Sequence, residues 1–167
     1  MKKWITVVLT LVVISIVMDS CMKDEITTTS SCPPLNVTAP ASEIAVLRAY
    51  IDSNHIAPTQ DSRGFFYSID FAASTDTAHP TRCSAVSATY TGTFLNGTVF
   101  DSTGADRPVS FNLSATIAGW QEAIPLMNSN ANMILYLPPS LAYGASGYSR
   151  IPGNSYLIFK IKLLGFN

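Results

Sequence analysis

A succession of strand-like segments around one short helical segment most constrains the fold of this chain. Aromatic and β-branched residues, in part alternating with polar ones, form five segments, at residues 64–72, 84–94, 109–113, 132–137 and 155–166. An Asn-Gly pair at positions 96 and 97 predicts a tight hairpin turn after the second segment. Between the third and fourth segments, residues 116–127 have a helical pattern that Pro125 limits to two or three turns. This order indicates an α+β fold in which an antiparallel sheet wraps around that helix.

A second helix is predicted ahead of the strands, at residues 43–54. Ser42 precedes it as a candidate N-cap, and Pro58 lies beyond its end. Its apolar positions follow helical spacing at Ile44, Leu47 and Ile51. We expect this apolar stripe to dock on the domain that follows.

The first 20 residues are typical of a signal peptide. A basic start precedes an uncharged run over residues 4–18, which is shorter than the roughly 20 residues of a membrane span. The pair Ser20-Cys21 then resembles the lipobox of bacterial lipoproteins, in which the cysteine becomes the lipidated first residue. We therefore expect residues 1–20 to be removed and Cys21 to carry the lipid that anchors the protein to a membrane. An ordinary secretory signal is the alternative.

Residues 21–41 are predicted to be a tether, because they are rich in threonine, serine and proline and have no periodicity. The cluster Lys23-Asp24-Glu25 resembles the surface-export signal of lipoproteins in the Bacteroidetes group, and a solvated tether is the alternative reading. The expected location is the cell envelope, lipid-anchored at the outer membrane and facing either the periplasm or the surface. Cys32 and Cys83 remain after Cys21, and two cysteines in an exported protein either pair or stay free.

Net charge and the spacing of cysteine and histidine residues argue against nucleic-acid binding and against a metal site. The formal net charge is −1, so the chain has no basic footprint for nucleic acid. No Cys-x-x-Cys or cysteine–histidine cluster has metal-ligand spacing, and His55 and His79 stand alone in the sequence. We expect neither a metal nor a cofactor.

Four motifs occur in one register over about eighty residues. They are YTGTFLNGTVFDS from Tyr90, GWQEAI from Gly119, LPPSLAYGASG from Leu137 and IPGNSYLIFKIKLL from Ile151. In this order they resemble the FKBP-type peptidyl-prolyl cis-trans isomerases, the macrolide-binding family, over residues 84–165. The tether and the extra N-terminal helix resemble the exported bacterial members.

The resemblance implies a half-barrel of five or six antiparallel strands curled around one short helix. It divides the chain into an N-terminal helix and strand extension at residues 42–83 and an FKBP-like domain at 84–167. The site is expected between helix and sheet. Carried over residue by residue, it comprises Tyr90, Phe100, Asp101, Ile117, Trp120, Tyr143, Ile151 and Phe159.

The same resemblance implies a role for most of these residues. Trp120 is expected to form the floor of the pocket. The walls are expected from Tyr90, Phe100 and Phe159. The backbone N–H of Ile117 and the hydroxyl of Tyr143 would face substrate carbonyls, and Asp101 would orient a wall tyrosine or a polar group of the ligand.

The implied function is a membrane-tethered prolyl isomerase that acts on proline-containing polypeptides and assists the folding of exported proteins. Val109 stands where the family usually has an aromatic residue, Arg150 where an apolar one is common, and the segments 113–120 and 144–151 are shorter than usual. We therefore expect a more open pocket with a more polar rim, and weak macrolide binding. The alternatives are a catalytically weak binding module for peptides or proteins on the cell envelope and, from the cluster behind Cys21 alone, a surface adhesin.

Overall fold

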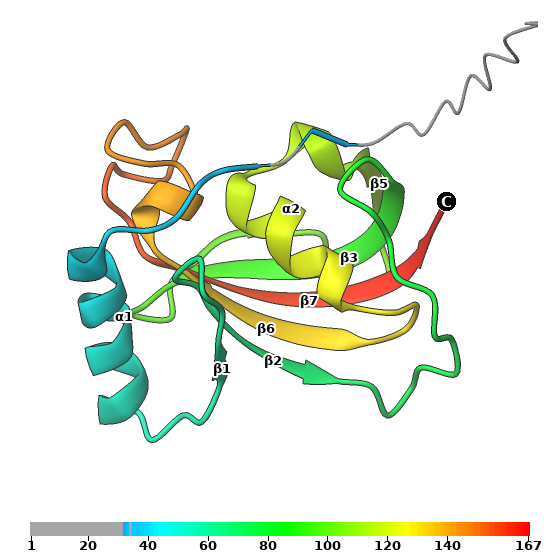
Figure 1. The fold of residues 1–167 in the computed structure, drawn as a ribbon, viewed down its shortest axis with the longest axis horizontal. Coiled ribbons are helices and arrows are strands. Elements are labelled where there is room, and N and C mark those ends of the chain that lie inside the picture. The colour runs from blue at the N-terminus through cyan, green and yellow to red at the C-terminus, as the bar shows by residue number, and fades with distance from the viewer. Residues whose placement is uncertain (1–31, 34) are drawn as a thin grey trace, which may run out of the picture. The chain divides into compact units, whose positions relative to one another are not determined.

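A twisted antiparallel sheet forms the framework of the domain (Figure 1). The structure, a computed structural model, describes residues 32, 33 and 35–167. The sheet order is β1-β2-β6-β7-β3-β4, and β5 pairs with β3 at its other end. The strands are β1 (Thr59–Gln60), β2 (Phe66–Asp70), β3 (Ala85–Phe94), β4 (Val99–Ser102), β5 (Val109–Asn112), β6 (Asn132–Leu137) and β7 (Leu157–Phe166). The antiparallel sheet and the short helix against it confirm the predicted α+β fold.

The predicted signal peptide at residues 1–20, the lipidation site Cys21 and the cluster at 23–25 lie outside the described residues. In the part of the chain that the structure describes, none of the helices combines the length and apolarity that crossing a bilayer requires.

The two longest strands, β3 and β7, pair along almost their full length at the centre of the sheet. Along β7, Phe159, Ile161 and Leu163 are buried, whereas Lys160 and Lys162 between them are exposed. This alternation confirms the two faces expected for the last strand.

The predicted Asn-Gly hairpin connects β3 to β4. The Phe94 amide donates to the Thr98 carbonyl (3.0 Å), and the Gly97 amide donates back to the Phe94 carbonyl (2.9 Å). Gly97 has φ +84°, which a residue without a side chain adopts at little cost. Together with the two-residue β1, β4 brings the sheet to seven strands, where five or six were expected.

Helix α2 (Ala118–Ala123) covers the inner face of the sheet and continues into a 3₁₀ turn at Ile124–Leu126. Pro125 lies in this turn, as its lack of an N–H predicts. Gly119 brings the helix close to β6, because a Cβ at this position would overlap the side chain of Leu137. This close approach sets the depth of the space between helix and sheet.

Helix α1 (Ala41–Ser53) packs on the outer face of the sheet, where Leu47 and Ile51 contact Phe66 and Tyr136. The predicted docking of this stripe is therefore confirmed. The predicted cap was wrong, because Ser42 lies inside the helix. Pro40 occupies the N-cap position, with φ −60° already suited to a first turn, and its carbonyl accepts hydrogen bonds from the amides of Glu43 and Ile44.

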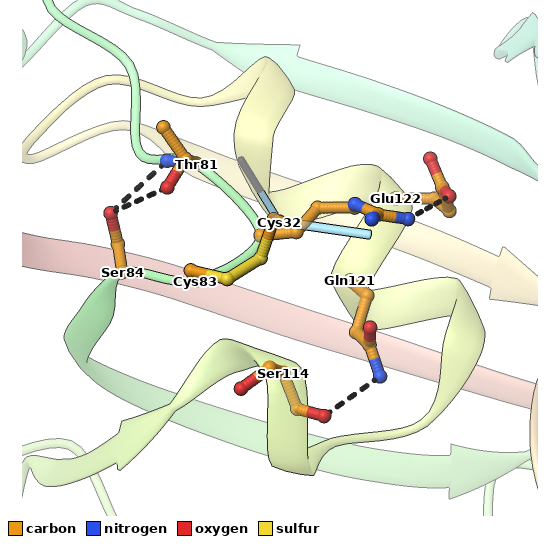
Figure 2. Close-up of a disulfide and its surroundings, with 8 residues drawn as sticks. Cys32, Thr81, Cys83, Ser84, Ser114, Gln121 and Glu122 are labelled. Atoms are coloured by element: carbon orange, nitrogen blue, oxygen red, sulfur yellow. Dashed lines mark hydrogen bonds and ion pairs between the residues drawn. A yellow bond between two sulfur atoms is a disulfide. The ribbon is translucent and has the colours of Figure 1, made fainter. Parts of the chain in front are cut away.

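Cys32 and Cys83 form a disulfide, which settles the question that the sequence left open (Figure 2). Their Cα atoms lie 5.6 Å apart, and the bridge spans 51 positions of the chain. It ties the segment before α1 to the loop that leads into β3, next to α2.

Candidate functional site

A cleft of about 1020 Å³ opens between α2, the sheet and the loop that precedes β7. All eight residues predicted for the site line it. They come from β3 (Tyr90), β4 (Phe100, Asp101), the start and body of α2 (Ile117, Trp120), the loop after β6 (Tyr143, Ile151) and β7 (Phe159). The structure thus brings together residues that are up to 69 positions apart in the sequence, since Tyr90 and Phe159 both contribute.

Trp120 lies at the centre of the aromatic residues of the cleft and is only 6% exposed. Its ring meets the rings of Tyr90 and Phe159 edge-on, with centroids 5.1 and 5.2 Å away. Such perpendicular contacts add to the stability that burial alone provides. They hold the indole in one orientation, with Nε1 buried and without a hydrogen-bond partner among the described residues.

Phe100 extends this aromatic wall towards the β3–β4 hairpin. Its ring is 5.6 Å from that of Phe159 and 5.1 Å from that of Phe94. Gly92 makes room for it, because a Cβ at Gly92 would lie 2.5 Å from the Phe100 ring and 3.0 Å from the Phe159 ring. The glycine of the YTG motif is therefore a determinant of cleft shape that we did not identify from the sequence.

The hydroxyl of Tyr90 donates a hydrogen bond to Oδ2 of Asp101 at 2.5 Å. This contact corresponds to the first of the two roles expected for Asp101, the orientation of a wall tyrosine. Burial raises the pKa of Tyr90 above its ordinary value, and the hydrogen bond to Asp101 raises it further. The hydroxyl is thus protonated at neutral pH, and the carboxylate fixes the edge of the ring.

Ile117 occupies the N-cap position of α2 with extended backbone (φ −62°, ψ 151°). Its carbonyl accepts hydrogen bonds from the amides of Trp120 and Gln121 (3.0 and 3.2 Å), whereas no hydrogen bond within the described residues engages its own amide. The Gln121 side chain donates to the carbonyls of Thr116 (2.8 Å) and Ser114 (3.2 Å), the second of which is drawn in Figure 2. This clamp holds the short segment that presents the Ile117 backbone to the cleft.

Tyr143 lies on the opposite side of the cleft, in the loop between β6 and β7. Its ring stacks on that of Tyr148, with centroids 5.5 Å apart and 12° between the planes. Burial raises the pKa of Tyr143, and the nearby carboxylate of Asp101 raises it further. Tyr143 therefore keeps its hydroxyl proton, and the hydroxyl can donate a hydrogen bond to a carbonyl.

Two aromatic residues of the cleft were missed in the sequence. Phe111 lines it and lies 5.4 Å from Trp120, so it supplies an aromatic contact near the small Val109. The alternation of β5 places Val109 and Phe111 on one face and was a usable signal. Tyr148 is the second aromatic residue of the cleft that was missed. Arg150, which was expected to make the rim more polar, also lines the cleft.

The residues that the structure describes contain no cluster of three or more histidine, cysteine, aspartate or glutamate side chains suited to a metal ion. His79 lies instead in a loop, where its Nδ1 is 3.1 Å from the Met127 carbonyl.

Comparison with known proteins gives one family. Its sequence profile, described as FKBP-type peptidyl-prolyl cis-trans isomerase, matches residues 76–164. The chain is 44% identical over 87 residues to "Peptidyl-prolyl cis-trans isomerase Mip" of Coxiella burnetii, which covers 51% of this chain and 38% of that protein. It is 43% identical over 89 residues to "Outer membrane protein MIP" of Legionella longbeachae, covering 52% of this chain and 38% of that protein.

A solved structure extends the likeness to the fold. The crystal structure of FkpA from Escherichia coli superposes with a TM-score of 0.67 at 30% identity, over 76% of this chain and 60% of the other. The chain therefore matches less than two thirds of the length of each of these relatives.

Proposed function

Because the chain belongs to the family of FKBP-type peptidyl-prolyl cis-trans isomerases, we propose that it catalyses the cis–trans isomerisation of peptide bonds that precede proline. The observation that carries this proposal is the aromatic cleft itself. Trp120 lies at its base, and the rings of Tyr90 and Phe159 stand perpendicular to the indole. Such a cleft matches the shape and apolar character of a proline ring.

The chemistry needs a change of environment rather than a covalent step. Rotation about a peptide bond crosses a barrier of ~18–20 kcal/mol, and an X–Pro bond isomerises in tens to hundreds of seconds without help. In the twisted transition state the amide loses resonance and its C–O dipole shrinks. An aromatic cleft solvates the polar planar amide less well than water does, so it favours the twisted form and lowers the barrier.

Two hydrogen-bond donors orient the substrate in this proposal. The amide of Ile117, at the start of α2, binds the carbonyl of the proline. The hydroxyl of Tyr143, across the cleft, binds the carbonyl of the residue before it. A tyrosine hydroxyl of ordinary pKa, about 10, is already protonated at neutral pH, and the raised pKa of Tyr143 keeps this donor protonated to higher pH. Asp101 acts through Tyr90, whose ring it holds against Trp120.

The proposed setting is the cell envelope, with Cys21 lipidated and the domain tethered to the outer membrane by residues 21–41. The clients are exported proline-containing proteins. The disulfide supports this setting, because such bonds persist in oxidising compartments. The name of the Legionella relative, "Outer membrane protein MIP", supports it as well. Metabolic labelling with radioactive palmitate tests the anchor: we expect incorporation that the variant Cys21→Ala loses, and an unlabelled wild type contradicts the anchor.

The isomerase proposal is tested with the purified full-length chain in a protease-coupled assay on X–Pro peptides. We expect acceleration well above the uncatalysed rate, and a loss of about tenfold or more in kcat/KM for Trp120→Ala. Because truncating a buried tryptophan also costs stability, Tyr143→Phe serves as a second variant that removes only one hydroxyl. Phe71→Ala is the matched control, since Phe71 is an exposed aromatic outside the cleft. No acceleration with any peptide contradicts the proposal.

A binding module without useful catalysis is the second candidate. The observations that favour it are at the rim: Val109 is 40% exposed and offers little wall, and Arg150 adds a charge. This reading predicts peptide affinity in calorimetry that persists while no peptide is accelerated. It also predicts that a macrolide ligand binds only weakly, because one wall of the cleft is small.

A further inference from the structure

A tight turn at Tyr148–Ile151 forms one rim of the cleft. Tyr148 and Ile151 exchange two backbone hydrogen bonds, of 2.9 and 2.8 Å. Ser149, the first central residue, has φ +51°, whereas Arg150 has a negative φ. A positive φ at the first central position alone is typical of a two-residue hairpin turn of type II′. The turn therefore has a defined backbone that presents Arg150 at a fixed place.

The loop behind the turn is closely packed on itself. The Gly147 amide donates to the Tyr143 carbonyl (3.1 Å), and the Asn154 amide donates to the Gly144 carbonyl (2.9 Å). A Cβ on Gly147 would lie 2.7 Å from the Gly153 amide nitrogen. These contacts tie the turn to the backbone of Tyr143 and Gly144.

Tyr148 places an exposed aromatic surface next to Tyr143. Its side chain is 68% exposed, although one face of its ring stacks on the ring of Tyr143. An aromatic ring in this position offers apolar area to whatever extends out of the cleft past Tyr143.

Arg150 brings the only cation among the residues that line the cleft, and Asp101 the only carboxylate. Asp101 is already hydrogen-bonded to the Tyr90 hydroxyl. In the described part of the chain, ion pairs join Arg63 and Arg82 to acidic groups, and none engages Arg150. Its guanidinium therefore retains its full capacity to bind a carboxylate from outside.

We propose that this turn selects substrates that carry an acidic residue immediately before the proline. The inference rests on the proposed function, in which the proline lies on Trp120 and the preceding carbonyl meets Tyr143. The side chain before the proline then points to the rim. There its aliphatic stem packs on Tyr148, and its carboxylate pairs with Arg150.

The test compares two peptides that differ only in charge, Ala-Glu-Pro-Phe and Ala-Gln-Pro-Phe, with the full-length chain. Each rate is divided by the uncatalysed rate of the same peptide. We expect kcat/KM to favour glutamate by about two- to fivefold, as an exposed ion pair allows. The preference should fall towards one in 1 M salt, where the Debye length is about 3 Å.

Variants of Arg150 test whether the turn causes the preference for glutamate. Arg150→Gln should bring the glutamate-to-glutamine ratio to about one, and Arg150→Lys should restore part of it. Lys160→Gln is the control, because it changes the net charge by the same amount. Lys160 is exposed on the other face of the sheet, so this variant should keep the wild-type glutamate-to-glutamine ratio. A wild-type ratio of one, or a preference that survives in Arg150→Gln, overturns the inference.

Calorimetric affinities for the same two peptides separate this inference from the proposed function. If no peptide is accelerated, the isomerase proposal fails, whereas an affinity ratio that favours glutamate and depends on Arg150 still supports selection by the turn. If peptides are accelerated and neither rate nor affinity favours glutamate, only the inference fails.

Discussion

Glu122 of α2 is buried against the guanidinium of Arg82, with 3.3 Å between its Oε1 and Arg82 Nη1. Its second oxygen pairs with Arg63, which also binds Asp61. Arg82 directly precedes Cys83 of the disulfide, and Figure 2 draws Glu122 among the residues that surround the bridge. Ion pairs from Glu122 to Arg63 and Arg82 therefore connect α2, the helix that carries Trp120, to two loops.

The first prediction concerns this cluster. Glu122→Gln removes the carboxylate, leaves Arg82 without its acidic partner and leaves Arg63 with Asp61 alone, which should lower the free energy of unfolding by about 1–3 kcal/mol. Urea denaturation followed by circular dichroism measures the loss. Asp106→Asn, at an exposed position in the loop after β4, is the control and should change stability little. An unchanged urea midpoint for Glu122→Gln would mean that the cluster does not hold α2.

The second prediction concerns the disulfide. A cross-link that spans 51 positions restricts the unfolded chain, and the loop-entropy estimate for this length is about 4 kcal/mol. We expect the double variant Cys32→Ser/Cys83→Ser to lose stability of up to this size. The wild type with a reducing agent should then unfold at the urea concentration of the double variant. If reduction leaves the wild-type midpoint in place, the bridge contributes nothing measurable.

The strands were predictable to the extent that alternation was visible over their length. Segment 132–137 corresponds to β6 residue for residue, and the lysines of β7 lie on the expected face. β1 has two residues, too few to display a period of two, and β4 was not among the predicted segments. The N-terminus of α1 was misplaced because a proline and a serine close together both suit a helix start, and only the backbone geometry distinguishes them.

The site was predictable mainly because the motifs of the family occur in register. Taken singly, Trp120 and Phe159 have the pattern of ordinary core residues, and both are indeed buried. The partners of Glu122 could not be predicted from the sequence, because Arg82 is 40 positions away and no local pattern connects the two residues. The space that Gly92 leaves for Phe100 likewise depends on the pairing of β3 with β4.

The third prediction is a dependence of stability on alkaline pH. The pKa of Tyr90 is raised in the folded protein, mainly by burial and then by Asp101. Its contribution to stability is fully present below about pH 10, the pKa of an unfolded tyrosine, and is lost as the pH rises towards the folded pKa. Tyr136, Tyr143 and Tyr156 have the same direction of shift and act alike.

Urea denaturation at pH 8 and pH 11 checks this dependence. We expect the wild type to be less stable at pH 11, and Tyr90→Phe to show a smaller loss between the two pH values. Tyr148→Phe serves as the control, because Tyr148 is largely exposed, and its loss should equal that of the wild type. An equal loss in Tyr90→Phe would show that ionisation of Tyr90 is not coupled to folding.

The fourth prediction tests how the wall of the cleft is built. A Cβ at Gly92 would overlap the ring of Phe100 and press on Phe159, so Gly92→Ala should displace Phe100 from the cleft. The backbone of Gly92 does not have a positive φ, and alanine is therefore tolerated conformationally. We expect kcat/KM for X–Pro peptides to fall about tenfold, with a loss of stability of roughly 1–3 kcal/mol from overpacking.

The double variant Gly92→Ala/Phe100→Ala separates a steric cause from a general weakening of β3. Removing the Phe100 ring relieves the overlap, so the double variant should be less destabilised than the sum of the two single variants. Its activity should stay low, because the wall is missing in either case. Strict additivity of the two unfolding free energies would show that the glycine does not make room for the ring, and the shape of the cleft would then have to depend on other contacts of β3 and β4.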